Sequence, residues 1–169
     1  MNDFNLAALY EALDAERQER GLTWQEALSQ INRRSDRRTA GHPIAKSTLS
    51  NLRTGAIAEG DGVLQMLRWL NRTPESFVPG CEPLEVHKLP DIPADQILRF
   101  DTTRLHAALG AQRVARGLTW KQVAAEIGGM SATSLTHLKN GGRTGFPFVM
   151  RMARWLNLPV AHFTRASRT

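Results

Sequence analysis

The tetrapeptide GLTW stands at residues 21–24 and again at residues 117–120, within the longer stretches AERQERGLTWQEALSQI and AQRVARGLTWKQVAAEI. Glycine ends a helix readily because it adopts the left-handed conformation of the C-terminal cap at little cost. A threonine followed three residues later by Glu or Gln is the pattern of a capping box, which begins a helix. Each GLTW therefore predicts one helix ending and the next beginning with almost no loop between them.

The repeat extends well beyond the tetrapeptide. At an offset of 96, matching residues occur at Phe4, Leu9, Ala12, Leu13, Arg17, Arg20 and Ile31. At an offset of 86, they occur at Leu49, Leu52, Gly55, Arg68, Trp69, Leu70, Asn71 and Phe77. The first copy therefore has ten extra residues between Ile31 and Leu49. We predict two domains, copy one at 1–79 and copy two at 100–169, joined by a mostly extended, Pro-rich linker at 80–99.

Short helices are predicted throughout both copies, and the fold class is all-α. Near the N-terminus, apolar residues recur with the spacing of one helix face from Leu6 to Leu13. In copy two, Gly128 and Gly129 interrupt the chain and Ser131 is placed to cap a further helix. The equivalent of Ser131 in copy one is Ala45, a poor cap, so we expect Pro43 to open that helix instead. Copy two thus predicts a helix, a turn of about four residues and a second helix.

Positive charge is unevenly distributed along the chain. The net charge is +6 overall, but residues 100–169 carry ten Lys or Arg against two acidic residues. In copy one, residues 33–53 carry six basic residues against Asp36 alone. Local basic blocks of this kind favour a polyanionic partner, most often nucleic acid. A solvated surface is the alternative, and charge alone does not separate the two.

Several other classes of protein are disfavoured. The single cysteine, Cys81, allows no intrachain disulfide, and the histidines show no metal-ligand spacing. No nucleophile–base grouping, phosphate loop or carboxylate cluster is present, so we expect no enzyme activity, no metal and no cofactor. No apolar run approaches the ~20 residues of a membrane span. The charged N-terminus is unlike a secretory signal, so we expect a cytoplasmic, nucleoid-associated protein.

The motifs RGLTWKQVAAEIGGMSATSLTHLKNGG and MARWLNLPVAHF resemble the phage-repressor (Cro-like, or XRE) helix-turn-helix family. Copy one offers RGLTWQEALSQI, STLSNLRTG and LRWLNRTPESF. The resemblance covers most of the chain outside the linker. It implies two five-helix domains, each inserting its third helix into the major groove of double-stranded DNA, and a transcriptional regulator, typically a repressor.

The same resemblance implies which residues contact DNA. Base edges would be read by Lys46, Ser47, Thr48 and Asn51 in copy one, and by Ala132, Thr133, Ser134 and His137 in copy two. Lysine suits a guanine edge and asparagine suits adenine, so copy one has the better chemistry for reading bases. The DNA backbone would be contacted by Trp24, Arg33, Arg34, Arg37, Arg38, Arg53, Trp120, Lys121, Lys139, Asn140 and Arg143.

Three features depart from the family pattern. Trp24 and Trp120 stand where the family often has a phosphate-binding Gln, and packing against a neighbouring helix is the alternative role for them. Arg53 and Lys139 stand where the family often has a Glu that pairs with an arginine of the first helix, here Arg17 or Arg113. That ion pair cannot form. The third departure is the Arg-rich insertion in the turn of copy one, which either clamps phosphates or is a solvated loop.

Three functional alternatives stay open at this stage. The main hypothesis is a sequence-specific regulator that binds double-stranded DNA. A second is a protein-interaction module that kept the fold and lost base reading in one or both copies. A third is an antitoxin in which one copy binds DNA and the other binds a protein. Homodimerisation is open in each case.

Overall fold

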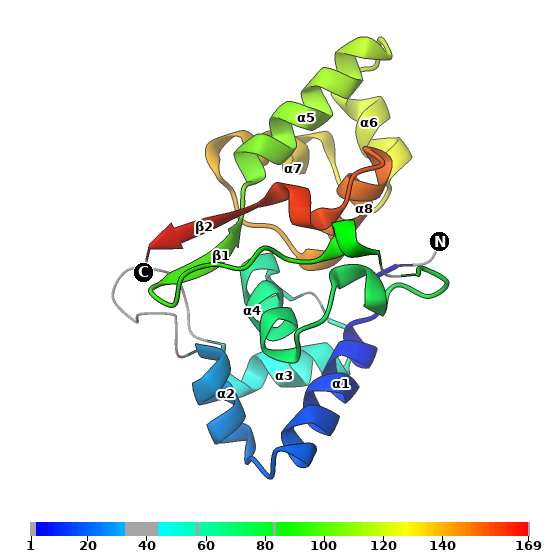
Figure 1. The fold of residues 1–169 in the computed structure, drawn as a ribbon. Coiled ribbons are helices and arrows are strands. Elements are labelled where there is room, and N and C mark those ends of the chain that lie inside the picture. Colours follow the sequence, from blue (N-terminus) through cyan, green and yellow to red (C-terminus); the bar gives the residue numbers. More distant parts are fainter. Residues whose placement is uncertain (1–2, 33–43, 57, 83, 169) are drawn as a thin grey trace.

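The computed structural model describes residues 3–32, 44–56, 58–82 and 84–168 (Figure 1). The chain is mostly helical with a small two-stranded sheet. The described residues of copy one form four α-helices and one 3-10 helix: α1 (Leu6–Glu19), α2 (Trp24–Asn32), α3 (Lys46–Arg53), α4 (Gly60–Leu70) and η1 (Pro74–Phe77).

The same order of helices recurs in copy two. It contains α5 (Thr102–Ala115), α6 (Trp120–Ile127), α7 (Ala132–His137), η3 (Leu138–Asn140), α8 (Phe146–Trp155) and η4 (Val160–Phe163). A short 3-10 helix, η2 (Glu85–His87), lies in the linker. In Figure 1, α1–α3 form the lower half of the molecule, α5–α7 form the upper half, and α4 and α8 meet between them.

The capping residues predicted from the sequence begin the helices as expected. Thr23 and Glu26 form a reciprocal capping box, as do Thr119 and Gln122. Ser131 caps α7 by accepting a hydrogen bond from the backbone N–H of Ser134, whereas Ala45 offers α3 no side-chain cap. The glycines of the two GLTW turns have φ of 65° and 64°, the left-handed region that favours glycine. The predicted role of Pro43 lies outside the described residues.

The prediction of an entirely α-helical fold is wrong in one respect, because two strands pair. β1 (Gln96–Phe100) and β2 (Thr164–Arg168) are antiparallel, with Leu98 opposite Ala166. β1 falls mostly within the segment predicted as an extended linker, and Ile97 and Leu98 are buried. Its extended backbone finds partners only because β2, some 70 residues later, lies beside it, and the local pattern contains no sign of that pairing.

The two copies meet at an antiparallel bridge between Glu59 and Gly145. We call the contact region around this bridge the seam. The backbone N–H of Gly60 donates to the carbonyl of Thr144 at 3.0 Å, and that of Phe146 donates to the carbonyl of Ala58 at 2.9 Å. Each residue of one bond is the equivalent, at the offset of 86, of a residue in the other. The copies are therefore related here by an approximate two-fold rotation.

Aromatic rings fill the space around this bridge. Phe4 lies before α1 and Phe100 lies before α5, and both pack on Phe146, at 4.6 and 5.5 Å between ring centroids. The equivalent of Phe146 in copy one is Gly60, where a Cβ atom would approach the ring of Phe100 to 2.7 Å. Gly60 thus leaves the space that the ring of Phe100 occupies. The buried side chains of both copies form one continuous core.

Polar contacts also cross between the copies. Arg151 of α8 makes a two-pronged ion pair with Asp3, with its nitrogens 2.6 and 3.0 Å from the carboxylate oxygens. Gln65, the equivalent of Arg151, donates to the carbonyl of Leu98 at 2.6 Å. Each copy therefore holds the segment that precedes the first helix of the other. Because these bonds tie both segments, the linker is not the only connection between the copies.

Candidate nucleic-acid interface

The outward side of α3 carries the base-reading candidates of copy one. Lys46, Ser47 and Asn51 are exposed and Thr48 is half-buried. Leu49 and Leu52 point the other way and are buried in the core. The helical period therefore separates the core-forming residues from a polar side that carries one amine, two hydroxyls and one amide.

The corresponding side of α7 carries the candidates of copy two. Thr133, Ser134 and His137 are exposed and Ala132 is half-buried, while Leu135 is fully buried. The hydroxyl of Ser134 lies 3.0 Å from that of Ser131, so it already takes part in the cap of the helix. Fewer free hydrogen-bonding groups face outward from α7 than from α3.

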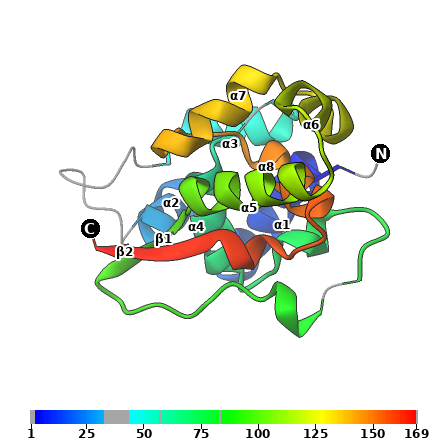
Figure 2. The same ribbon diagram turned by 90° about the horizontal axis from the view of Figure 1, so that it is seen from above.

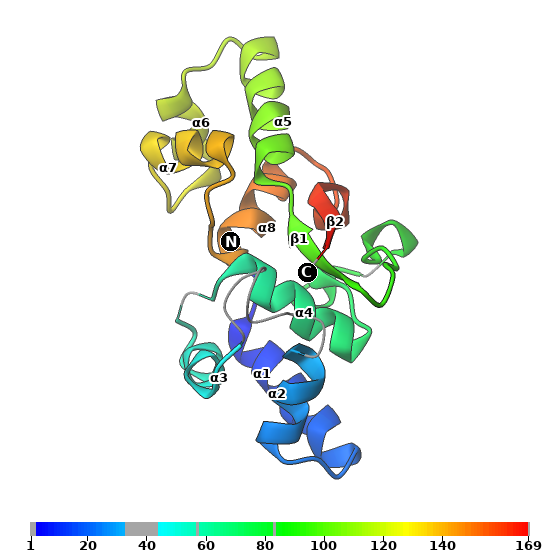
Figure 3. The same cartoon turned by 90° about the vertical axis from the view of Figure 1, so that its left-hand side faces the viewer.

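Both helices lie on one side of the molecule. Seen from above, α3 and α7 are together at the upper edge of Figure 2, and after rotation about the vertical axis both lie toward the left of Figure 3. The linker runs along the opposite side in both views. The two helices that carry the base-reading candidates therefore lie on the same side of the molecule.

The tryptophans of the GLTW turns have packing roles in both copies. Trp24 stacks on Tyr10 at 5.5 Å, and Trp120 stacks on His106 at 4.9 Å. Burial, together with the charge of Lys139, lowers the pKa of His106, which favours the neutral ring. Both indoles are half-buried. These contacts support the packing role of both tryptophans, whereas a contact between an indole and a phosphate stays a prediction.

The arginines of the first helices hold the GLTW turns closed. Arg17 donates to the carbonyl of Leu22 at 2.7 Å, and Arg113 donates to the carbonyl of Leu118 at 3.0 Å. Each guanidinium also lies 5.1 Å from the ring centre of the following tryptophan. The sequence pattern predicts only that these arginines lack the glutamate partner usual in the family that the chain resembles. Their recurrence at the offset of 96 was the signal that could have revealed this role.

The structure describes some, but not all, of the other residues expected to contact the DNA backbone. Five are exposed: Arg53, Lys121, Lys139, Asn140 and Arg143. Arg143 forms an ion pair with Glu59, with 3.3 Å between Nε and Oε1. The arginines of the insertion lie outside the described residues: Arg33, Arg34, Arg37 and Arg38.

The insertion of copy one is closed at its base by a side chain that sequence analysis missed. The amide of Asn32 donates to the carbonyl of Ile44 at 2.9 Å and accepts from the backbone N–H of Ile44 at 2.8 Å. The side chain of Asn32 therefore pairs with the backbone of Ile44 as a second backbone would, and it joins the two ends of the insertion. This pair fixes the start of α3 although the intervening residues are not described.

A second pair of equivalent networks joins the first, second and fourth helices of each copy. Trp69 donates its indole N–H to Gln30 at 3.0 Å, and Trp155 donates to Glu126 at 2.8 Å. The guanidinium of Arg20 lies over Trp69, and that of Arg116 lies over Trp155. Hydrogen bonds from Arg116 and Trp155 lower the pKa of Glu126. These half-buried tryptophans are therefore parts of the framework of each copy.

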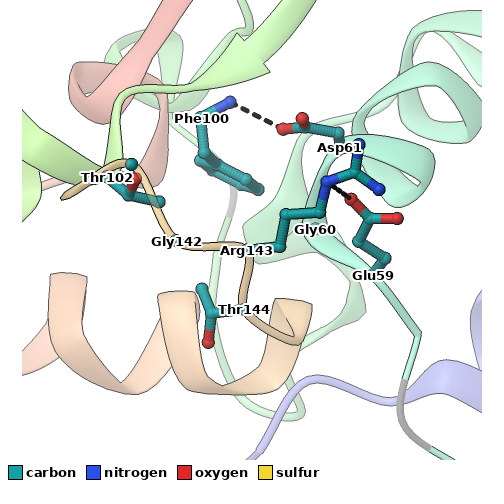
Figure 4. Close-up of a pocket in the computed structure, with 9 residues that line it drawn as sticks. Glu59, Gly60, Asp61, Phe100, Thr102, Gly142, Arg143 and Thr144 are labelled. Atoms are coloured by element: carbon teal, nitrogen blue, oxygen red, sulfur yellow. Dashed lines mark hydrogen bonds and ion pairs between the residues drawn. The ribbon is translucent and has the colours of Figure 1, made fainter. Parts of the chain in front are cut away.

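A small cavity lies beside the bridge between the copies. Its volume is about 30 Å³, and Figure 4 shows Glu59, Asp61, Phe100 and Arg143 around it. The backbone N–H of Phe100 donates to Asp61 at 2.8 Å, and the Arg143–Glu59 ion pair lies at the rim. A space of this size holds about one water molecule, so it is no site for a larger ligand.

Comparison with known proteins identified no family model that matches the chain, and no curated protein or solved structure matched it either. Within the described ranges, no cluster of three or more His, Cys, Asp or Glu side chains is arranged to hold a metal ion. No helix in those ranges has the length and hydropathy needed to cross a membrane.

Proposed function

We propose that the chain is a sequence-specific, double-stranded DNA-binding regulator built from two helix-turn-helix domains, and that it acts as a repressor in the manner of the phage-repressor family. The position of α3 and α7 on one side of the molecule, each with exposed polar residues, carries this proposal. A major groove about 12 Å wide admits one α-helix, and successive major-groove faces recur every 34–36 Å or so on one side of the duplex. Two helices presented on one side suit two such faces.

Charge supports the same proposal. Copy two combines +8 net charge with exposed Lys121, Lys139 and Arg143 next to α6 and α7. Neutralising DNA phosphates releases counterions, and this supplies most of the sequence-independent affinity for DNA. Asn51 and Lys46 add side chains that form two-pronged bonds with adenine and guanine edges. Copy one would therefore supply most of the base discrimination and copy two much of the general affinity.

The contacts between the copies favour a fixed spacing between two unlike half-sites. The bridge at Glu59 and Gly145, the Asp3–Arg151 ion pair and the shared core all restrict relative movement. One chain would then read a bipartite, non-palindromic site with half-sites about one helical turn, or 10–10.5 base pairs, apart.

Selection of bound sequences from a random DNA pool tests this function. The full chain is compared with a variant that has six Gly-Ser residues inserted after Asp91, an exposed linker residue. We expect both proteins to select the same bipartite site with the same spacing, because the seam and not the linker sets the distance. Failure of the full chain to enrich any sequence would contradict the proposal. A spacing that broadens in the longer variant would contradict the fixed seam.

A protein-binding role for copy two is the second candidate, and one observation favours it. The outward side of α7 has few free hydrogen-bonding groups, since Ser134 is engaged in the cap and Ala132 has no polar atom. In that case the selected site would contain the half-site of copy one alone. The antitoxin alternative is one form of this role, in which the protein that binds copy two is a toxin.

A further inference from the structure

The two edges of the β1–β2 sheet differ in what covers them. Side chains of α4 cover the edge of β1. Gln65 donates to the carbonyl of Leu98 at 2.6 Å, and the backbone N–H of Phe100 donates to Asp61 at 2.8 Å. Leu98 and Phe100 therefore direct these backbone groups away from β2. In an antiparallel pair, two residues opposite each other either both face the partner strand or both face away from it.

The register then shows which groups of β2 face outward. Ala166 lies opposite Leu98 and Thr164 lies opposite Phe100, so both direct their N–H and C=O groups away from β1. Alternation along the strand adds Arg168. Ala166 is exposed, and within the described ranges no side chain or loop bonds to its backbone. An edge with open backbone groups is a template for a further strand.

Positive charge surrounds this open edge. Arg165 and Arg168 are exposed, and neither forms an ion pair with another described residue. The register also places Arg165 directly opposite Arg99 of β1, and like charges in such a pair destabilise a sheet. Asp61 lies 3.9 Å from Arg99 and offsets one of these two charges. Because Asp95 precedes β1 at the end where Arg168 lies, the excess of positive charge is greatest at Arg165.

Charge also separates the two strands that could occupy the edge. A second copy of this chain would bring its own β2, and with it two more arginines, to the same place. Charged side chains on an edge strand are a common protection against such self-pairing. An acidic strand would instead place a carboxylate beside Arg165 and offset the charge that faces Arg99. The edge therefore suits an acidic partner.

We propose that the open edge of β2 binds an extended, acidic segment of a partner protein as a third, antiparallel strand. The backbone of the segment pairs with the outward groups of Thr164, Ala166 and Arg168, and acidic side chains opposite the arginines supply selectivity. The residue opposite Arg165 belongs to a non-hydrogen-bonded pair, in which side chains lie closest.

The position of β2 makes this site independent of DNA binding. In Figures 2 and 3, β2 lies on the side of the molecule opposite α3 and α7. A segment bound at β2 would leave the outward sides of both helices free. The site therefore goes beyond the function proposed above and does not rest on it, and its tests contain no DNA.

Binding of a short peptide to the full chain tests the site. The probe is the peptide TEVTEVT with both ends blocked. When its central threonine lies opposite Ala166, its glutamates lie opposite Arg165 and Arg168. Fluorescence polarisation compares it with TKVTKVT, and we expect the acidic peptide to bind about tenfold more tightly, because two cross-strand charge pairs change sign. Equal binding of the two peptides, or no binding of TEVTEVT at millimolar concentration, overturns the proposal.

Methylated peptides test whether the probe binds as a strand. Methylating the backbone nitrogen of the central threonine removes an N–H that would point at β2. Methylating that of the preceding valine removes an N–H that would point away, so this peptide is the matched control. The first change should weaken binding about tenfold or more through the lost hydrogen bond, and the control should bind like the unmodified peptide. Equal effects of the two methyl groups would refute strand addition.

Charge variants locate the peptide on the chain. Arg165→Gln should weaken binding of TEVTEVT by up to about fivefold, the range of a cross-strand charge pair. Arg165→Glu should shift the preference toward TKVTKVT. Arg116→Gln is the control, because Arg116 is an exposed arginine at the far end of α5, and its binding should equal that of the unchanged chain. Binding of TEVTEVT that is unaffected by both Arg165 variants would place the peptide elsewhere.

Sedimentation of the chain alone tests the other occupant. We expect no dimer that involves β2, so adding TEVTEVT should leave the oligomeric state unchanged. A dimer that dissociates when TEVTEVT is added would assign the edge to a second copy of the chain and overturn the proposal.

Discussion

Copy one and copy two are held by the same contacts at equivalent residues, yet they differ where a ligand would meet them. In both copies the residue that caps the first helix bonds back to the end of the copy: Asn5 donates its backbone N–H to the carbonyl of Phe77, and Asp101 donates to that of Phe163. The fourth helix of copy one is capped at its C-terminal end by Asn71, in the left-handed conformation. Asn157, its equivalent in copy two, has the same conformation.

The differences are concentrated in the turn before the third helix and on the outward side of that helix. Copy two makes the turn in four residues and caps α7 with Ser131. Copy one interposes a longer segment, closes it with Asn32 and begins α3 without a side-chain cap. The repeated residues therefore specify a shared framework, whereas α3 and α7 differ on their outward sides. Five experiments test this similarity and this difference.

The largest effect is expected from Phe146→Ala. Phe146 is fully buried and contacts rings that precede the first helix of each copy, so the variant leaves a cavity at the seam. Loss of a buried phenyl group costs about 3–5 kcal/mol of unfolding free energy. Urea denaturation measures it, with Phe148→Ala, a half-buried ring on the same helix, as control. A loss no larger than that of the control would mean that the copies are stable separately.

Gly60→Ala tests the copy-one counterpart of the same position. The added Cβ atom would meet the ring of Phe100 at 2.7 Å, and overpacking of this kind costs about 1–3 kcal/mol. Gly62→Ala is the control on the same helix, since its Cβ atom would lie 3.7 Å from Ile44, an ordinary contact. We expect the control to be neutral or slightly stabilising. Equal thermal stability of the two variants would show that the seam tolerates a methyl group here.

Asn51→Ala and His137→Ala test the base reading proposed for each copy. We expect Asn51→Ala to lose about 1–3 kcal/mol of discrimination at one or two base pairs, because an asparagine–adenine pair is worth about that much. His137→Ala should change the selected site less. Binding to selected and scrambled duplexes measures both. An unchanged site in Asn51→Ala, with a changed site in His137→Ala, would reverse the roles assigned to the copies.

Thr23→Ala and Thr119→Ala test whether the shared framework is energetically equivalent. Each removes the oxygen that accepts from the backbone N–H three residues later. Each should cost about 1 kcal/mol of unfolding free energy, the usual contribution of an N-cap threonine. Thermal denaturation of both variants, with the double variant beside them, measures the costs and their additivity. Clearly unequal losses of unfolding free energy would show that the same capping geometry contributes differently to stability in the two copies.

The smallest effect concerns the ion pair between Asp3 and Arg151. The hydrogen bond from Arg151 lowers the pKa of Asp3 below its ordinary value of 3.8. Its contribution to stability is therefore present above pH 3.8 and is lost as the pH falls through the lowered pKa of the folded state. Asp3→Asn should cost no more than ~0.5 kcal/mol at neutral pH, because ion pairs this exposed contribute little. It should also flatten the acid limb of stability against pH, whereas Asp91→Asn, in the exposed linker, should not.

Local features were predictable from the sequence and distant ones were not. The capping boxes, the Ser131 cap and the helix order depend on residues within a few positions of one another, so short patterns were sufficient. The β1–β2 pairing and the Gly60–Thr144 bond join residues about 70 and 84 positions apart, and no local pattern encodes them. Arg17 and Asn32 were missed because their partners are backbone carbonyl and N–H groups, which the sequence does not distinguish.

The candidate site likewise has a part that was predictable from the sequence and a part that was not. Which residues of α3 and α7 face outward follows from the helical period, because Leu49 and Leu135 had to be buried. That both helices lie on one side of the molecule follows from the seam, and the seam depends on contacts that the repeat pattern alone did not reveal. The space of about 320 Å³ between η1, α8 and η4 was equally hidden, since residues of both copies and the linker line it.

The aromatic cluster at the seam has a consequence for how such a molecule can arise and change. Two identical subunits must place every side chain on both sides of their axis, so a group of rings shared across that axis comes in even numbers. Phe4 and Phe100 are equivalent rings, but the residue equivalent to Phe146 is Gly60, so Phe146 has no counterpart. A single covalent chain permits such an unmatched ring. It allows one half to accept a substitution at the axis that the other half could not tolerate.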